Sequence, residues 1–347
     1  MKKIKAGIIG ATGYAGVELC RLILGHPQAA LGGISSVSFT GKPLSAVYPA
    51  FRGICDRICQ EQEAVIDQSD VIFAAVPHGL SQPIAKCCME AGKVFIDLGA
   101  DFRLAEEADY QTWYQGSYDD PQLHQQAAYG LPECFREKIR GKRLVANPGC
   151  YTTAVPLALY PALEAGLLET QGIVADCKSG VTGAGRSPSQ NTHFPELNEN
   201  FYAYKAATHR HTPEIEQSLR QITGEAHLTI TFVPHLLPVS RGILATCYAQ
   251  LKPGVTAAQL EEAYRAHYQD EYFIRMLPMD QSPQLRSVRY TNLCEISFTV
   301  DRRTGRFIAI SAIDNMVKGA AGQAVQNMNL CMGFDEKAGL TGIPPGI

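Results

Sequence analysis

Short apolar runs alternate with helix-like stretches through the first half of the chain. The pattern predicts buried strands at residues 5–10, 30–36, 70–77, 93–100 and 142–149, and helices at residues 14–25 and 81–92. Such alternation is typical of an open parallel sheet with helices on both faces. Residues 105–130, rich in Tyr and Gln and containing the single Trp, are predicted to be irregular.

The pattern changes after Gly166, where the apolar runs become longer. Strands are predicted at residues 173–180, 228–239 and 243–252, and residues 295–314 are predicted to form a hairpin around Asp-Arg-Arg-Thr-Gly. Helices are predicted at residues 213–222, 256–268 and 315–333. This half therefore indicates a mainly antiparallel α+β domain.

Composition narrows the class of protein. The 347 residues carry a net charge of −3, which gives no sign of a basic surface that would bind nucleic acid or an anionic membrane. No apolar run approaches the ~18 residues that span a bilayer. The eleven cysteines include no C-x-x-C pair and follow no signal peptide, so we expect reduced thiols in a cytoplasmic protein.

A glycine-rich turn, GATGYAG, follows the first predicted strand and opens the first predicted helix. Its glycines are Gly10, Gly13 and Gly16. Glycines there let the backbone approach a pyrophosphate, which the helix N-terminus then holds. The alternative is a tight strand-to-helix turn with no ligand. The position within a β-α-β unit favours a dinucleotide.

The end of the second predicted strand indicates which dinucleotide. NAD sites usually carry Asp or Glu there to bind the ribose 2′-hydroxyl. This chain has Ser35, Ser36, Val37 and Ser38, with Lys42 shortly after. A carboxylate would repel a 2′-phosphate, whereas hydroxyls and a cation accept one, so NADP is favoured. The alternative is that these serines only begin a polar loop.

Cys150 lies behind Asn-Pro-Gly at the start of a long apolar helix. Unpaired N–H groups and the helix dipole favour a thiolate at that point. A structural cysteine is the alternative. Candidate partner bases lie in HRHTPE, namely His209, His211 and Glu214. A His-x-His pair can bind metal, but no Cys-rich or carboxylate-rich cluster lies at ligand spacing, so no metal is expected.

Three arginines are candidate clamps for an anionic substrate, because a guanidinium matches carboxylate or phosphate geometry. Arg186 lies in a loop with Gly180, Gly183 and Gly185, which is pliant enough to face a substrate. The other two are Arg103 and Arg241, and His211 is a further candidate to contact the substrate. An ordinary surface loop and a salt bridge from Arg103 to Asp101 are the alternatives.

In combination these motifs resemble the N-acetyl-γ-glutamyl-phosphate reductases of arginine biosynthesis. GIIGATGYAGVEL, DLGADFRL, YGLPE, VANPGCYTTAVPLALYP, SGVTGAGR, HRHTPEIEQ, HLLPVSRGI and DNMVKGAAGQAVQNMN occur in the family's order from end to end. The resemblance implies an α/β fold in which a Rossmann doubly wound parallel sheet is joined by an α+β, glyceraldehyde-phosphate-dehydrogenase-like second domain. The last helix would return to the first domain. Residues 1–149 and 315–347 would then form the dinucleotide-binding domain, and residues 150–314 would form the catalytic and dimerisation domain.

The resemblance also implies NADPH-dependent reduction of an acyl phosphate to a semialdehyde through a cysteine thioester. Cys150 would be the nucleophile, His209 the acid/base with His211 as alternative, and Glu214 the group that orients the histidine. The implied cofactor residues are Gly10, Thr12, Gly13, Tyr14, Ala15, Gly16, Ser36, Pro77, Ser179, Gly180 and Asn315. One departure is that SVSFTGK stands where many relatives carry an arginine after the second strand.

Other assignments remain open at this point. Aspartate-semialdehyde dehydrogenase shares the architecture but is expected to have a different histidine environment. A lysine-pathway aminoadipyl-phosphate reductase would call for a basic docking face, and a sensor that binds NADPH without chemistry would need neither Cys150 nor His209. A cysteine hydrolase would have no use for the glycine turn. The expected partner is a small-molecule acyl phosphate, and the resemblance implies a homodimer or homotetramer.

Overall fold

The chain divides into two compact units in the computed structural model, which describes residues 3–279 and 281–346. The first unit runs to Pro148 and includes Ala320–Thr341. The second comprises Gly149–Gly319 and the residues from Gly342 onward. The segment expected to return to the first domain, 315–347, is thus divided between the two units.

The first unit is built on a parallel sheet with the strand order β2-β1-β3-β4-β6-β5. Its strands are β1 (Ile4–Ile9), β2 (Ala29–Ser35), β3 (Val71–Ala74), β4 (Val94–Asp97), β5 (Ala128–Tyr129) and β6 (Leu144–Ala146). The five strands predicted for this half are confirmed. The strand order reverses at β1, which has β2 on one side and β3 on the other. Open sheets bind ligands at the carboxyl ends of strands at such a point.

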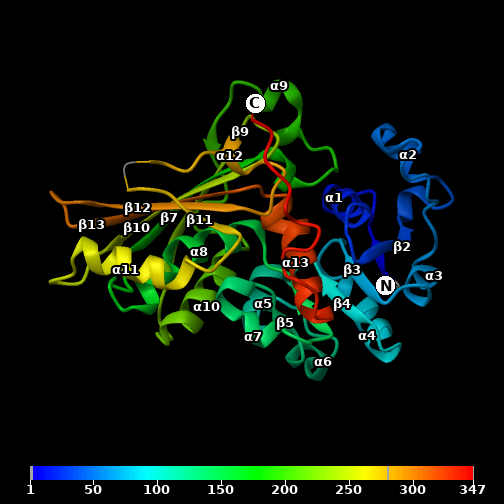
Figure 1. Cartoon of the computed structure of the whole chain (residues 1–347), viewed down its shortest axis with the longest axis horizontal. Coiled ribbons are helices and arrows are strands. Elements are labelled where there is room, and N and C mark those ends of the chain that lie inside the picture. Colours follow the sequence, from blue (N-terminus) through cyan, green and yellow to red (C-terminus); the bar gives the residue numbers. More distant parts are fainter. Residues whose placement is uncertain (1–2, 280, 347) are drawn as a thin grey trace. The chain divides into compact units, whose positions relative to one another are not determined.

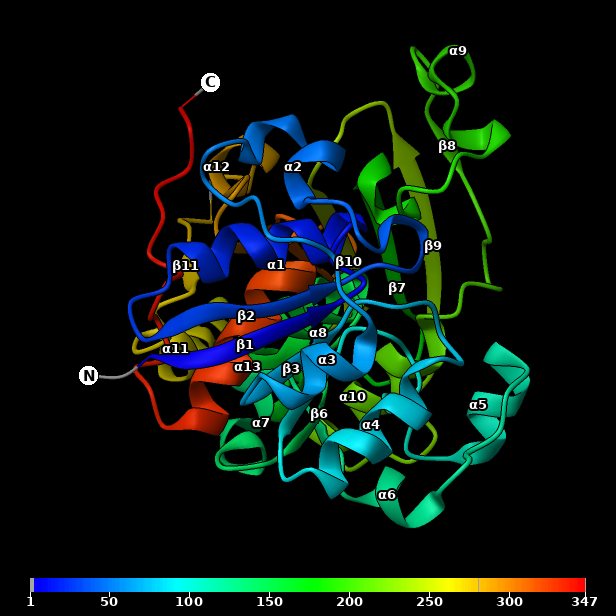
Figure 2. The same ribbon diagram turned by 90° about the vertical axis from the view of Figure 1, so that its right-hand side faces the viewer.

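Helices cover both faces of this sheet. The helices of this unit are α1 (Tyr14–Leu24), α2 (Leu44–Val47), α3 (Gln62–Asp67), α4 (Ser81–Glu90), α5 (Glu107–Tyr114), α6 (Pro121–Gln125), α7 (Pro132–Ile139) and α13 (Gly322–Met332). Helices α1 and α13 lie on one face, and α3 and α4 lie on the other (Figures 1 and 2). Val65 and Ile84 from the latter pair pack with Phe95 in one buried cluster. The doubly wound architecture is confirmed.

Two predictions for this unit were wrong in detail. Residues 105–130 are not irregular, because they contain α5 and α6. The start of α6 has a local signal, since the Asp120 side chain accepts the Leu123 N–H at 3.0 Å and Pro121 occupies the first turn. The final helix also begins later than residue 315, because a π-helical turn, Val317–Ala321, precedes α13.

The second unit contains a mixed sheet with the order β11-β12-β13-β10-β7-β9-β8. Its strands are β7 (Ile173–Gly180), β8 (Tyr202–Ala203), β9 (Ile230–Leu237), β10 (Ile243–Gln250), β11 (Ile274–Met276), β12 (Cys294–Asp301) and β13 (Arg306–Ile313). The pairs β7/β9 and β11/β12 are parallel and the remaining pairs are antiparallel. The predicted hairpin is confirmed as β12 and β13, whose last pair joins Asp301 to Arg306.

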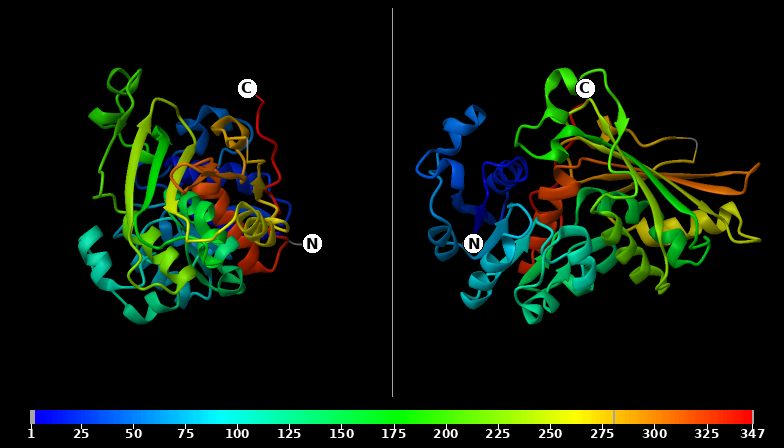
Figure 3. Two further views of the ribbon diagram at one scale, coloured as in Figure 1. Left: turned by 90° about the vertical axis from the view of Figure 1, so that its left-hand side faces the viewer. Right: turned by 180° about the vertical axis from the view of Figure 1, so that it is seen from behind.

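The helices of the second unit are α8 (Cys150–Glu164), α9 (Phe194–Leu197), α10 (Thr212–Thr223), α11 (Ala257–Tyr268) and α12 (Leu285–Val288). Helices α8, α10 and α11 lie along one face of the mixed sheet (Figures 1 and 3). Alternate residues of β7 and β10 are buried against this face, as the period of a half-covered strand requires. The opposite face of these strands is only half-buried.

Candidate functional site

Two of the three glycines in the first turn are required by the fold. Gly10 has φ +83°, and a Cβ there would lie 2.3 Å from the Ala75 carbonyl oxygen. A Cβ on Gly16 would lie 2.2 Å from the Gly10 carbonyl oxygen. Gly13 differs, because its φ of −73° suits any residue and its nearest neighbour would be 3.5 Å away. Neither the backbone conformation nor a close neighbour therefore requires glycine at position 13.

The start of α1 offers backbone donors beside Gly13. Gly13 is the N-cap, and in the described part of the chain no side chain caps this helix and no acidic residue lies in its first turn. The N–H groups of Tyr14, Ala15 and Gly16 have no carbonyl four residues earlier within the helix. Such an uncapped helix start, free of negative charge, is suited to bind a phosphate.

Thr12 and Ser36 connect this turn to the end of β2. Their hydroxyl oxygens lie 2.6 Å apart, and both side chains are buried. The Tyr48 hydroxyl donates to the Thr12 carbonyl oxygen at 2.9 Å. Ser38 and Lys42, beyond Ser36, are exposed, and so is Pro77 after the neighbouring strand β3. The predicted cofactor residues of the first unit thus lie at the carboxyl ends of β1, β2 and β3.

Cys150 is the first residue of α8 and is half-buried. The helix start is not open, because the fully buried carboxylate of Glu214 reaches it from α10. Glu214 accepts the Gly149 N–H at 3.0 Å and the Thr152 hydroxyl at 2.7 Å. This differs from the helix start envisaged from the sequence, since a negative charge now offsets part of the positive helix end.

His209 lies in an aromatic pocket. Its ring centroid is 5.6 Å from that of Tyr151, 5.7 Å from Tyr204, 5.3 Å from Phe232 and 4.8 Å from His211. Burial lowers the pKa of His209 to about 2, with further lowering from the charges of His211, Lys205 and Arg210, while Glu214 raises it by the smallest contribution. The imidazole is therefore neutral near neutral pH.

The hydrogen bonding of His209 indicates which nitrogen carries its proton. Nδ1 accepts the backbone N–H of His211 at 3.1 Å. A neutral imidazole has one donor and one acceptor nitrogen, so we assign the proton to Nε2. His209 is then a neutral hydrogen-bond donor through Nε2. The choice between His209 and His211 as the acid/base therefore stays a prediction.

The structure gathers the predicted catalytic residues around Tyr151, the residue after Cys150. His211 is the N-cap of α10, and its ring lies 5.9 Å from that of Tyr151. The Tyr151 hydroxyl lies 3.1 Å from that of Tyr204. Sequence reasoning did not single out Tyr151, Tyr204 or Phe232. The adjacency of Tyr151 to Cys150 is the only local signal that could have found one of them.

The three candidate arginines differ in accessibility. Arg103 is buried and donates to the carbonyl oxygens of Asn147, at 2.8 Å, and Leu98, at 2.7 Å. Arg241 pairs with the fully buried Asp314 at 3.4 Å, and its guanidinium lies 4.6 Å from the Tyr290 ring centroid. These two hold parts of their own unit in place. Arg186 is exposed on its loop.

Ser179, Gly180 and Asn315 meet at one cluster of loops in the second unit. Gly180 donates to the Gly242 carbonyl oxygen at 2.8 Å, and a Cβ on Gly180 would lie 2.8 Å from Ser240 backbone atoms. The Asn315 side chain accepts the Gly242 N–H at 2.7 Å and donates to the Thr182 hydroxyl at 3.0 Å. Buried Asn315 thus joins the ends of β7, β10 and β13.

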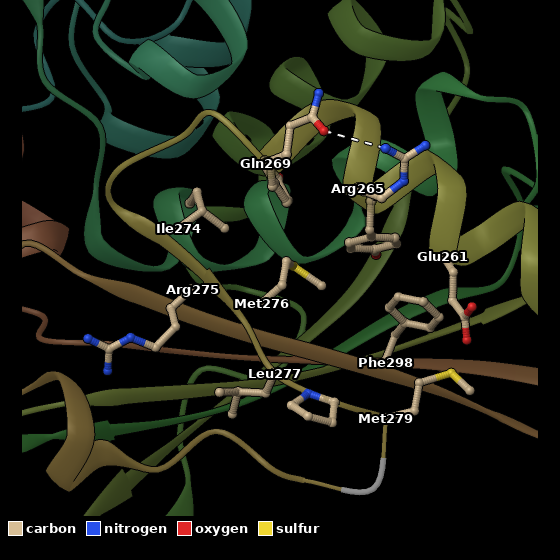
Figure 4. Close-up of a pocket in the computed structure, with 12 residues that line it drawn as sticks. Glu261, Arg265, Gln269, Ile274, Arg275, Met276, Leu277, Met279 and Phe298 are labelled. Atoms are coloured by element: carbon tan, nitrogen blue, oxygen red, sulfur yellow. Dashed lines mark hydrogen bonds between the residues drawn. The ribbon is translucent and has the colours of Figure 1, made fainter.

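Other features of the described chain lie apart from these residues. A cavity of about 510 Å³ lies between α11, β11 and β12, and its lining includes Tyr264, Tyr268 and Phe298 (Figure 4). None of the predicted site residues lines it. Within residues 3–279 and 281–346, no group of three or more His, Cys, Asp or Glu side chains is placed to hold a metal ion. No helix in those ranges has the length and apolar character to cross a membrane.

Comparison with known proteins matches both units to one group. Residues 5–142 match the family described as semialdehyde dehydrogenase, NAD binding domain, and residues 150–315 match semialdehyde dehydrogenase, dimerisation domain. A protein of Clostridium botulinum named N-acetyl-gamma-glutamyl-phosphate reductase is 52% identical over 342 residues, which are 99% of each chain. One of Pelotomaculum thermopropionicum with the same name is 49% identical over 346 residues and 99% of each chain.

The chain belongs to the N-acetyl-gamma-glutamyl-phosphate reductase family. The resemblance inferred from the motifs is thereby confirmed, and membership makes the chain an oxidoreductase. Solved structures similar to this family member include aspartate semialdehyde dehydrogenase II of Vibrio cholerae, with a TM-score of 0.75, 19% identity and coverage of 96% and 99% of the two chains. The Candida albicans aspartate semialdehyde dehydrogenase structure with NADP gives a TM-score of 0.71 at 16% identity, covering 95% and 99%. These likenesses show the fold.

Proposed function

We propose that this chain reduces N-acetyl-γ-glutamyl phosphate to N-acetyl-glutamate 5-semialdehyde and phosphate with NADPH, as a step of arginine biosynthesis. The observation that carries the proposal is the position of Cys150 at the start of α8, where Glu214 reaches the preceding peptide and two histidines pack around the following tyrosine. Relatives that carry this reaction in their names cover the whole chain at 46–52% identity.

Cys150 is the proposed nucleophile. Its thiolate attacks the acyl carbon of the substrate, so that a C–S bond forms and the C–O bond to phosphate breaks. The thiol proton passes through a histidine to the departing phosphate, and a thioester remains on Cys150. The thioester is needed because, unlike a free carboxylate, it is reactive enough to be reduced.

The two histidines have separate roles in this proposal. A group with a pKa of about 2, as burial gives His209, does not hold a proton near neutral pH. We therefore assign proton transfer to His211 and hydrogen-bond donation through Nε2 to His209. Donation by a neutral imidazole stabilises the oxygen that becomes negative when the acyl carbon turns tetrahedral, and first-turn N–H groups of α8 are further donors.

The cofactor residues proposed for NADPH are those predicted from the sequence. Gly10, Thr12, Gly13, Tyr14, Ala15 and Gly16 would hold the pyrophosphate, with Ser36 near the 2′-phosphate and Pro77, Ser179, Gly180 and Asn315 completing the site. When bound, NADPH supplies the hydride that reduces the thioester. The hemithioacetal on Cys150 then collapses to the aldehyde and releases the thiolate. Preference for NADPH over NADH is supported by the absence of Asp and Glu from residues 35–42.

The reverse reaction tests this function. Purified protein should oxidise N-acetyl-glutamate 5-semialdehyde only when both NADP and inorganic phosphate are present. Cys150→Ser should abolish this turnover and retain NADPH binding, measured by fluorescence titration. Turnover by Cys150→Ser would exclude the thioester route. Equal activity with aspartate semialdehyde would instead favour aspartate-semialdehyde dehydrogenase, the alternative on the same fold, and activity only on a carrier-linked aminoadipyl substrate would favour the lysine-pathway alternative.

We also propose that two copies associate through the half-buried face of the mixed sheet. Val174, Leu244, Tyr248, Ile308 and Ile310 lie on that face of β7, β10 and β13. The same face also carries Asp176, Lys178 and Thr246. A face that mixes apolar and polar side chains suits an interface between copies, and the matched family is described as a dimerisation domain. The proposed assembly is a homodimer, or a homotetramer built from such dimers. Light scattering should show smaller particles for Ile310→Arg than for the wild-type protein. The cytoplasm is the proposed compartment.

A further inference from the structure

Gly319 packs directly against the Cα and Cβ atoms of Cys150. A Cβ built on Gly319 would lie 2.8 Å from the Cys150 Cβ, 3.2 Å from its Cα and 3.3 Å from the Ile313 Cδ1. The φ of Gly319 is outside the left-handed region, so glycine is not required by the backbone conformation. It is required by space, and the residue that takes the space is the proposed nucleophile.

The backbone around Gly319 is held by a fully buried carboxylate. Asp314 Oδ1 accepts the N–H groups of Met316 at 2.7 Å and Val317 at 3.2 Å, and the Asp314 carbonyl oxygen accepts the Gly319 N–H at 2.9 Å. These bonds form the entry of the π-helical turn Val317–Ala321. Single π-helical turns are frequent at functional sites, where they displace a short stretch of backbone from the regular helical path.

Cys150 is thus fixed from two directions. Glu214 holds the peptide N–H that precedes it, at Gly149, and Gly319 covers one side of its Cβ. The atoms nearest to an added Cβ at position 319 include the Cβ and Cα of Cys150, so Gly319 lies against the base of this side chain. We propose that Gly319 is a positioning residue, which sets the direction of the Cys150 thiol and excludes any larger residue from position 319. The expected effect on turnover rests on the function proposed above, whereas the expected effect on the reactivity of the Cys150 thiol does not.

Gly319→Ala tests the inference through two readouts. An added Cβ would lie 2.8 Å from the Cys150 Cβ, closer than real Cβ atoms come, so one of the two must shift. Misplacement on the scale of 1 Å costs catalysis about 10²-fold. We expect kcat to fall ~10–10²-fold with the KM for NADPH unchanged. We also expect the rate of iodoacetamide labelling at Cys150, followed by peptide mass spectrometry across pH, to change several-fold.

Ile313→Val provides the matched control, because it removes the other atom that the new Cβ would meet. In the double variant Ile313→Val/Gly319→Ala, labelling and turnover should not return to their wild-type rates. Recovery of both would show that the defect is core crowding at Ile313 and would overturn the inference. Wild-type labelling in Gly319→Ala would overturn it as well. Gly25→Ala, where a Cβ would meet only the Leu22 carbonyl oxygen at 3.7 Å, controls for loss of glycine itself.

Two further outcomes are distinguishable. If Gly319→Ala does not fold, the test is whether the double variant Cys150→Gly/Gly319→Ala folds. One of the two clashing Cβ atoms is absent from that variant. Recovery of folding supports the contact, and an equally unfolded double variant contradicts it. If the wild-type protein does not act on the acyl phosphate but Gly319→Ala still changes Cys150 labelling, the proposed function fails and the positioning role of Gly319 stands.

Discussion

The carboxylate of Glu214 accepts the backbone N–H of Gly149 at 3.0 Å and so binds the start of α10 to the start of α8. The same oxygen accepts the Thr152 hydroxyl at 2.7 Å. Glu214 was predicted to orient His209. That role stays a prediction. The hydrogen bonds to Gly149 and Thr152 show that Glu214 also holds the start of the helix that begins with Cys150.

Replacing Glu214 separates its charge from its hydrogen bonds. Glu214→Ala leaves the Gly149 N–H without this acceptor, and an unsatisfied buried group costs about 1–3 kcal/mol. The Thr152 hydroxyl keeps the Gly149 carbonyl oxygen as an acceptor. Glu214→Gln keeps an acceptor oxygen and should retain most of the stability. Urea denaturation of the two variants measures the difference. Equal loss of stability would show that the charge, rather than the acceptor, holds the helix start.

Acidification should destabilise the protein through His209. Its folded pKa of about 2 lies below the ordinary value of 6.5, so between these values the unfolded chain binds a proton that the folded chain does not. Stability contributed by the neutral ring is present above pH 6.5 and is lost as pH falls, by up to about 1.4 kcal/mol per pH unit. His209→Asn, whose side-chain oxygen can replace Nδ1 as acceptor, should show a shallower fall between pH 7 and 5. An unchanged slope would place the titration elsewhere.

Exchange of each histidine should identify the proton carrier. His211→Asn should lower kcat ~10²–10⁴-fold, the contribution typical of a general acid–base group. His209→Asn should lower it less, because only a hydrogen bond to the developing oxyanion is lost. Steady-state kinetics across pH measure both, with His227→Asn as a control in an exposed histidine. If the two effects are reversed, His209 is the base that the sequence first suggested.

The glycine turn offers a matched pair of substitutions. Gly13→Ala places a Cβ where only the Gly10 carbonyl oxygen lies near, at 3.5 Å, so the Tm should not change while the affinity for NADPH falls at least ~10-fold. Gly16→Ala places a Cβ 2.2 Å from the same oxygen, so the Tm itself should fall. Wild-type NADPH affinity in Gly13→Ala would remove the turn from the cofactor site.

Some of the site could be found from the sequence because its signals are local. The glycine turn, the serines that end β2 and Cys150 at the first position of α8 each follow from spacing within a few residues. The arginines show where this reasoning ends. Arg103 and Arg241 have the right chemistry for an anion, but their partners Asn147 and Asp314 lie far along the chain. No local pattern could show that both guanidinium groups are already engaged.

The sequence by itself determined the alternation of strands and helices, the hairpin of β12 and β13 and the placement of a cysteine at a helix start, because periodicity and turn chemistry act over neighbouring residues. Only the tertiary structure decided that Glu214 reaches Gly149, that Gly319 lies against Cys150 and that burial lowers the pKa of His209. Those contacts join residues distant in sequence. Their consequences depend on burial, which is a property of the packed chain and not of any short segment.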